Sequence, residues 1–100
     1  MNIGKTIKQL RKDRGYSQIT FGERCEISQS ALSLIENGTR MPNKTTFRRI
    51  CEVLEVPEEL IYFLSIDEST IAQDKKEKFN TLYPWAKDLM MKIFLEDSNK

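Results

Sequence analysis

Apolar residues recur along the first two thirds of the chain at the three- and four-residue spacing that is typical of amphipathic helices. Ile3, Ile7 and Leu10 form the first such stripe, and Phe21 and Cys25 begin the second. The same spacing continues as far as Leu64, with polar residues between the stripes. The pattern predicts five short helices, over residues 3–14, 18–25, 29–37, 44–54 and 57–64.

Residues suited to helix ends lie at the boundaries of these segments. Ser17, Ser28 and Asn43 precede three of the predicted helices, where a side-chain oxygen can accept from an amide of the first turn. Gly15 and Gly38 follow two of them, because glycine adopts the left-handed conformation without steric cost. These positions predict where the helices begin and end.

The last third of the chain predicts two further helices. Ser65 to Glu68 matches a capping box and predicts a polar helix over residues 68–79. Residues 80–84 are expected to break or kink it, because the residue before a proline is biased away from the α region. A final helix over residues 82–96 then carries a broad apolar stripe.

This final stripe is more apolar than a terminal helix needs for docking on a small domain, and such surfaces mark interfaces. We favour a homodimer contact, with packing onto the chain's own core as the alternative and a groove for a protein antagonist as a third option. The expected interface residues are Leu82, Trp85, Leu89, Met90, Ile93 and Phe94.

Length and composition fit an all-α protein with one domain over residues 1–64 and a helical extension over residues 65–100, the expected dimerisation element. Charged residues make up 31% of the chain, which has only four glycines and three prolines. No apolar run reaches the roughly 18 residues of a membrane helix. The first residues also lack the apolar core of a signal peptide, so we expect a cytoplasmic protein without a membrane partner.

Charge is distributed unevenly, although the net charge is only +1. Residues 1–49 carry an excess of six positive charges, and the remaining residues carry an excess of five negative ones. This asymmetry suggests a nucleic-acid face at one end of the molecule. We expect the basic residues of the first helix to be solvated, with Arg11 and Arg14 close enough to the next helix for a DNA-backbone contact.

The chain has no histidine, no phosphate-binding loop and no paired acidic constellation, so we expect neither catalysis nor a small-molecule substrate. Its two cysteines, Cys25 and Cys51, both fall on apolar stripes and are expected to be buried thiols, with a disulfide or redox switch as the alternative. Two thiols cannot complete a zinc site, and we expect no metal or other cofactor.

The segment from Ser17 to Pro42 resembles the helix-turn-helix of XRE-like, lambda-repressor-like regulators, and the resemblance covers about residues 3–64. It implies a five-helix lambda-repressor-like domain that binds double-stranded DNA. The matching residues are Ser17, Gln18, Ile27, Ser28, Leu32, Ser33, Ile35, Glu36, Gly38, Arg40 and Pro42.

Three positions depart from the family pattern. Glu26 replaces the turn glycine, where a positive φ would cost about 1 kcal/mol unless the turn relaxes. Gly22 replaces the usual alanine, which lowers helix propensity but still allows close helix crossing. Leu34 replaces a polar DNA-contacting residue, so it either packs on a thymine methyl or is a tolerated surface residue.

The exposed face of the predicted helix at residues 28–37 carries uncharged side chains that donate and accept hydrogen bonds, which suits base edges in a major groove. We expect Gln29, Ser30, Ser33 and Leu34 to read bases. The resemblance implies that Glu36 is structural and pairs with a basic residue. The residues expected to hold the DNA backbone are Gln18, Ser28, Asn37, Thr39, Arg40, Lys44 and Thr45.

The sequence thus predicts a sequence-specific DNA-binding transcriptional regulator, a repressor that binds palindromic operators as a homodimer. The alternative is a protein-interaction module of the same fold, antitoxin-like or an adaptor, with weak or no specific DNA binding.

Overall fold

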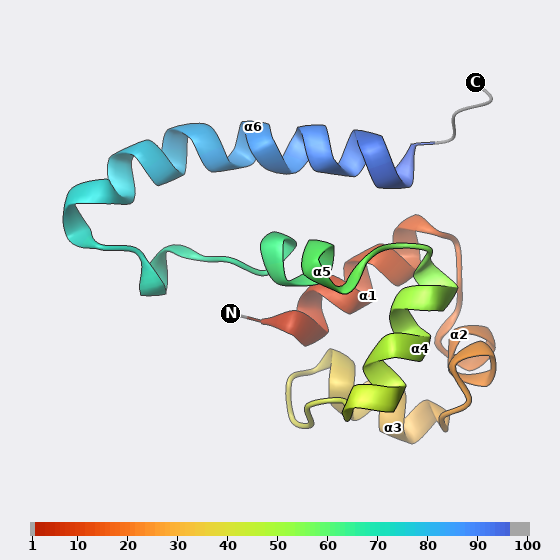
Figure 1. The fold of residues 1–100 in the computed structure, drawn as a ribbon. Helices are drawn as coiled ribbons and strands as arrows, with labels where there is room; N and C mark the ends of the chain where they lie inside the picture. The colour runs from red at the N-terminus through yellow and green to blue at the C-terminus, as the bar shows by residue number, and fades with distance from the viewer. Residues whose placement is uncertain (1, 97–100) are drawn as a thin grey trace.

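A computed structural model describes residues 2–96, which form six α-helices and two 3₁₀ turns without a strand (Figure 1). The five helices predicted for residues 3–64 are confirmed, with boundaries that differ by at most one residue. The elements are α1 Ile3–Asp13, α2 Gln18–Cys25, α3 Gln29–Glu36, α4 Lys44–Leu54, α5 Glu58–Leu64, η1 Glu68–Thr70, η2 Gln73–Lys75 and α6 Lys76–Leu95.

The predicted helix caps are also confirmed. The side chains of Ser17, Ser28 and Asn43 each accept a hydrogen bond from an amide three residues later, at 3.1, 3.0 and 2.8 Å. Gly15 and Gly38 have positive φ angles of 82° and 86°. Three of the short helices therefore begin at a side chain that satisfies a first-turn amide, and two end just before a glycine in the left-handed conformation.

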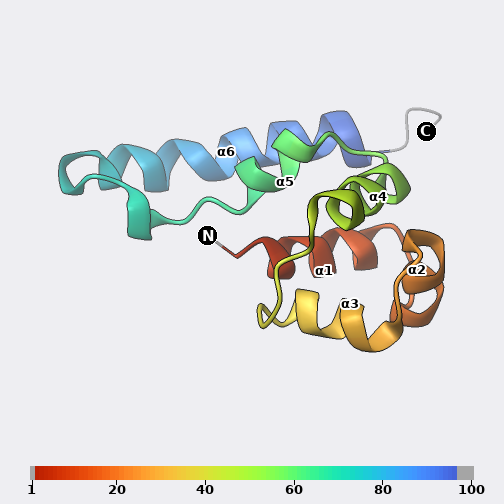
Figure 2. The ribbon, with the colours of Figure 1, turned by 60° about the horizontal axis from the view of Figure 1, so that its bottom comes forward.

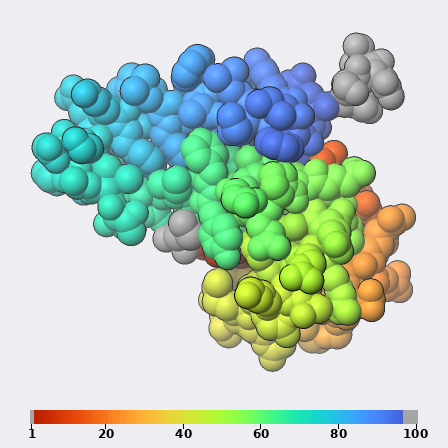
Figure 3. Space-filling model, viewed as in Figure 1, coloured from red at the N-terminus to blue at the C-terminus, as the bar shows by residue number. Residues whose placement is uncertain are grey.

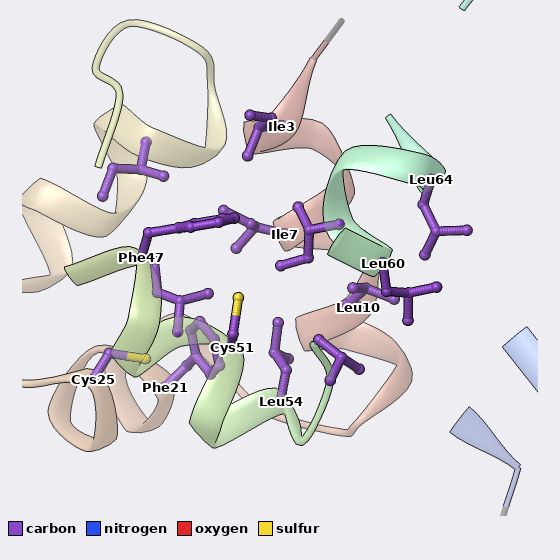
Figure 4. Packing of buried hydrophobic residues seen from close by; sticks show 14 of the residues in the cluster. Ile3, Ile7, Leu10, Phe21, Cys25, Phe47, Cys51, Leu54, Leu60 and Leu64 are labelled. Atoms are coloured by element: carbon purple, nitrogen blue, oxygen red, sulfur yellow. The ribbon is translucent and has the colours of Figure 1, made fainter. Parts of the chain in front are cut away.

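A single hydrophobic core joins α1 to α5 (Figure 4). Every one of these helices contributes at least one fully buried side chain; examples are Ile7, Phe21, Leu32, Ile50 and Ile61. Figures 1 and 2 show α3 and α6 on opposite sides of the layer that contains α1. The core therefore fixes α3 on a surface remote from α6.

The predicted polar helix over residues 68–79 and the predicted break before Pro84 are both wrong. Ser65 does not begin a helix, because it is buried and its hydroxyl donates to the carbonyl of Ile61 at 2.6 Å. Asp67 instead caps the short turn η1. No break occurs at Pro84, since α6 runs through it as one helix from Lys76 to Leu95.

Tertiary contacts explain how α6 accommodates its proline. A proline inside a helix costs about 3 kcal/mol, because one amide is lost and the ring crowds a carbonyl four residues earlier. That carbonyl belongs to Asn80, an exposed residue, so water can reach it. Next to the proline, the Tyr83 hydroxyl donates to the carbonyl of Phe63, and its ring stacks on Phe79. These contacts hold the turn of α6 that directly precedes Pro84.

The apolar stripe of α6 is divided between two faces. The inner face, formed by Met90, Met91, Phe94 and Leu95, packs against the core of the five-helix domain. Arg14 reinforces this docking, since it donates to the carbonyls of Leu54 at 3.0 Å and Phe94 at 2.9 Å. The expectation that Arg14 is solvated or close to DNA is therefore wrong.

The outer face of α6, formed by Leu82, Trp85, Leu89 and Ile93, is exposed in the single chain. The N-terminal half of α6 also extends beyond the five-helix domain, together with the turns before it (Figure 3). Two of the six predicted interface residues, Met90 and Phe94, thus lie on the inner face, and four lie on the outer face.

Both cysteines are buried and free, as predicted for two core thiols. Burial raises the pKa of the Cys25 thiol to about 11. Burial, together with the carboxylates of Glu58 and Glu59, raises the pKa of the Cys51 thiol to about 12. Among the described residues, no helix has the length and apolar character needed to cross a membrane.

Gly4 allows α1 to lie directly against the end of α3. A Cβ atom at this position would lie 2.0 Å from the carbonyl oxygen of Ile35 and 3.1 Å from that of Glu36. We expect Gly4→Ala to lower the free energy of unfolding by about 1–3 kcal/mol, because the backbones must move apart. Urea denaturation measures this effect, with the exposed Lys8→Ala on the same helix as control. Equal stability of the two variants would contradict the close contact.

Candidate nucleic-acid interface

The turn between α2 and α3 has the tight geometry of a helix-turn-helix. Glu26 takes the left-handed conformation there, with φ 61° and ψ 39°. This is the positive φ anticipated for a non-glycine residue in the turn, so the turn does not relax. The Glu26 carboxylate lies 3.6 Å from Nε of Arg49, an exposed pair that contributes little stability.

Gly22 explains how the turn packs closely on α2. A Cβ atom on Gly22 would lie 3.1 Å from the carbonyl oxygen of Ile27, in the turn. The missing side chain therefore supports the close approach that was predicted for this position, and the lower helix propensity is its cost.

The surface of α3 that points away from the core is uncharged and, apart from Leu34, polar. Gln29 and Ser30 are exposed, whereas Ser33 and Leu34 are half-buried. The opposite side of α3 is buried at Leu32, Ile35 and Glu36. All four predicted base-reading residues therefore retain accessible surface, Leu34 less than Gln29.

A buried ion pair fixes α3 against α1. Arg11 donates from Nε and Nη2 to the two carboxylate oxygens of Glu36, at 2.7 and 3.1 Å. The two side chains are 7% and 2% exposed, and Arg11 also donates to the carbonyl of Tyr16 at 2.7 Å. The structural role expected for Glu36 is confirmed. The expectation that Arg11 is solvated or contacts DNA is wrong.

The ion pair continues outward as a chain of amide contacts. Gln18 donates from Nε2 to the Glu36 carboxylate at 3.0 Å. Gln29 in turn donates to the Gln18 side chain, through a long contact of 3.4 Å. The arrangement links the buried Arg11 to the exposed Gln29 through three helices, so the first residue of α3 is held by groups from α1 and α2. In the described chain, no buried side-chain nitrogen or oxygen lacks a partner.

The residues predicted to hold a DNA backbone lie around α3, on α2, in the loop after α3 and at the start of α4 (Figure 1). The Asn37 side chain accepts from the amide of Thr39 at 2.9 Å and so shapes this loop. The first-turn amides of α4, at Lys44 and Thr45, have no partner within the helix, which is where an anion binds. Six of the seven predicted residues are exposed, namely Ser28, Asn37, Thr39, Arg40, Lys44 and Thr45. The seventh, Gln18, is half-buried.

Sequence reasoning missed Arg11, which positions α3 from inside the protein. Its position offers a signal in retrospect, since it continues the four-residue spacing of Ile3 and Ile7 on the buried face. A charged residue on a buried face requires a partner of opposite charge.

Comparison with known proteins adds independent information. The sequence model of a family described as helix-turn-helix matches residues 7–61. The HTH-type transcriptional regulator RamB of Mycobacterium tuberculosis is 33% identical over 75 residues, which cover 75% of this chain and 15% of that protein. The immunity repressor protein of Bacillus phage phi105 is 26% identical over 81 residues, 81% of this chain and 54% of the repressor.

The chain thus spans a minor part of the mycobacterial regulator and about half of the phage repressor. No solved structure gives a significant match. The family match covers more than half of the chain and includes the whole of α2, the turn and α3, whose geometry is described above. The protein therefore belongs to the helix-turn-helix family, in its XRE-like and lambda-repressor-like branch.

Proposed function

We propose that this protein is a DNA-binding transcriptional regulator, a repressor, whose helix α3 enters the major groove. The observation that carries the proposal is the exposed, uncharged face of α3, which begins at Gln29 and is braced from inside by Arg11 and Glu36. The names of the two relatives, a transcriptional regulator and an immunity repressor, support the same function.

Gln29 is the principal base reader in this proposal. Its amide can donate and accept at once, which matches the paired N6 and N7 groups of adenine. Ser30 and Ser33 supply shorter hydroxyl contacts, and the half-buried Leu34 offers an apolar surface for a thymine methyl. Arg40 and Lys44 supply positive charge to phosphates on either side of the groove.

We further propose that the regulator is a homodimer that pairs through the outer face of α6. Trp85 and Ile93 are 65% and 64% exposed, and Leu82 is 56% exposed. Large apolar side chains grouped on one helix face are unfavourable in water, and aromatic anchors of this kind dominate interface energies.

The arrangement of the operator follows from where α3 lies. A palindrome with half-sites one turn apart, about 34 Å, needs both copies of α3 on one duplex. α3 and α6 lie on opposite sides of the domain, so pairing through the outer face turns the two α3 helices away from each other (Figures 1 and 2). This observation favours half-sites on separate DNA segments over the contiguous palindrome expected from the sequence.

A protein-interaction module is the second candidate, favoured by the outer face of α6 and by the low net charge of +1. The outer face would then receive a protein antagonist or target. Selection of bound duplexes from a random DNA pool separates the two functions. We expect an enriched motif; no enrichment at low salt would favour the interaction module.

Replacing Gln29 with alanine should relax base preference at one position of the selected site by roughly 1–3 kcal/mol. The reason is that the lost amide contacts discriminate one base pair from the other three. Competition binding with single-base variants of the site measures this loss. Lys44→Ala is the matched control, since a phosphate contact should weaken binding to all sequences alike. A uniform loss for Gln29→Ala would contradict its role as a reader.

A further inference from the structure

The outer face of α6 is self-complementary when two copies run antiparallel. Across a twofold axis, residues equally far before and after the axis position lie beside each other. With the axis near position 87, Trp85 lies beside Leu89 of the second copy, and Leu82 lies near its Ile93. All four exposed apolar residues of the face then have apolar partners, and an isologous contact of this kind is the commonest in homodimers.

Charge selects the same arrangement. Lys78 lies on the same side of α6 as the outer face, one turn before Leu82, and Glu96 directly follows the last turn. In the antiparallel register, Lys78 lies beside Glu96 of the second copy, at both ends of the contact. A parallel pair would place Lys78 beside Lys78 and Glu96 beside Glu96, which is destabilising.

A shallow pocket beside the N-terminal half of α6 could receive side chains of the second copy at each end of the helix pair. It has a volume of about 360 Å³ and is lined by Ile71, Phe79, Leu82 and Ala86, with Lys75 and Lys78 also bordering it. In the antiparallel register this pocket meets the last turns of α6 of the second copy. Ile93 would enter the apolar part, and Glu96 would approach the two lysines.

From this complementarity, and resting on the proposed function, we infer that two copies pair through antiparallel α6 helices and hold two separate DNA segments. α6 lies on one side of the domain and α3 on the other (Figure 1), and the outer face of α6 is the one not packed on the core. A twofold axis at that face therefore places the two α3 helices at opposite ends of the dimer. The dimer is then a bridge between DNA segments.

The register is tested by charge exchange in the full chain, with dimer dissociation measured by sedimentation equilibrium. Lys78→Glu and Glu96→Lys should each weaken the dimer about tenfold, since each creates like-charge contacts at both ends. The double variant should restore the wild-type constant. Glu52→Lys, at an exposed position of α4, changes the charge equally and should have no effect. Additive weakening in the double variant, or a monomeric wild type, would overturn the register.

Bridging is tested with duplexes that each carry one site recovered from the random pool. One duplex is immobilised on beads, and a second, labelled duplex is free in solution. Wild-type protein should retain the labelled duplex on the beads. Trp85→Asp should bind the free duplex normally but retain at least tenfold less, because loss of an aromatic anchor separates the copies.

Two results would overturn bridging while leaving DNA binding intact. One is a dimer that binds the immobilised duplex but does not retain the labelled duplex on the beads. The other is a footprint in which one dimer protects two half-sites one turn apart on one duplex. Absence of any DNA binding would instead overturn the proposed function, and bridging with it, while charge exchange would still decide how α6 pairs.

Discussion

Replacing Glu36 with alanine is expected to lower the free energy of unfolding by about 3–5 kcal/mol, a large part of the stability of a small domain. The substitution leaves the Arg11 guanidinium buried without a carboxylate, since both side chains are almost fully buried. Gln18 also loses its acceptor, so the support of α3 at Gln29 is weakened. Urea denaturation followed by circular dichroism measures the loss.

Two controls separate the ion pair from general effects of mutation. Glu52→Ala removes an exposed carboxylate from α4 and should change stability by less than about 0.5 kcal/mol. The double variant Arg11→Met, Glu36→Leu should recover most of the stability, because apolar groups of similar size often replace a buried pair. A Glu36→Ala variant as stable as Glu52→Ala would refute the role of the pair.

Deleting residues 81–100 is expected to lower the stability of the remaining domain by roughly 4 kcal/mol, in addition to abolishing dimers. The deletion removes the inner face of α6, whose four partly buried side chains each contribute about 1 kcal/mol. It also removes the carbonyl of Phe94 to which Arg14 donates. Thermal and urea unfolding of the truncated chain measure the effect.

The outer-face variant Trp85→Ser is the matched control for this deletion. It removes a side chain that is 65% exposed in the single chain, so the monomer should unfold as the wild-type monomer does. Its effect should appear only in the dimer dissociation constant. A truncated chain that retains full stability would show that the inner face contributes nothing to the domain.

The five-helix domain was predictable because its signals are local. Ser17, Ser28 and Asn43 cap helices whose apolar stripes all face one core, so cap chemistry and periodicity indicate the same boundaries. At Glu26 the family pattern indicated only that a strained or a relaxed turn would replace the glycine, and the structure shows the strained, left-handed conformation.

The course of α6 was not predictable from local rules. The bias of the residue before Pro84 favours a break, but contacts of Tyr83 with Phe63 and Phe79 hold the helix together. Phe63 belongs to α5, and no local pattern specifies how α5 and α6 pack. The tertiary contacts outweigh the local preference.

The division of α6 into an inner and an outer face was not predictable either, because it also depends on tertiary contacts. Leu89, Met90, Ile93 and Phe94 are all apolar, so periodicity alone merges them into one broad stripe. Which of them face inward depends on how α6 crosses the domain, and Arg14 helps to fix that crossing. Sequence reasoning therefore detected excess apolar surface but could not separate docking residues from exposed ones.

In the candidate nucleic-acid interface too, features set by local sequence were predictable and features set by distant residues were not. The exposed residues of α3 follow from helix geometry and were predicted, whereas Arg11 acts through Glu36, 25 positions away along the chain. A pairing of that separation is visible only when the helices have been placed against each other.

Whether α3 reads DNA is tested by a fluorescence anisotropy titration of the selected duplex and a scrambled duplex at several salt concentrations. We predict that the protein binds the selected duplex roughly 1,000-fold more tightly at about 150 mM salt. Both affinities should fall linearly with salt on logarithmic axes, because phosphate contacts release counterions. Equal affinity for the two duplexes, or no binding at about 50 mM salt, would contradict the claim that α3 reads DNA.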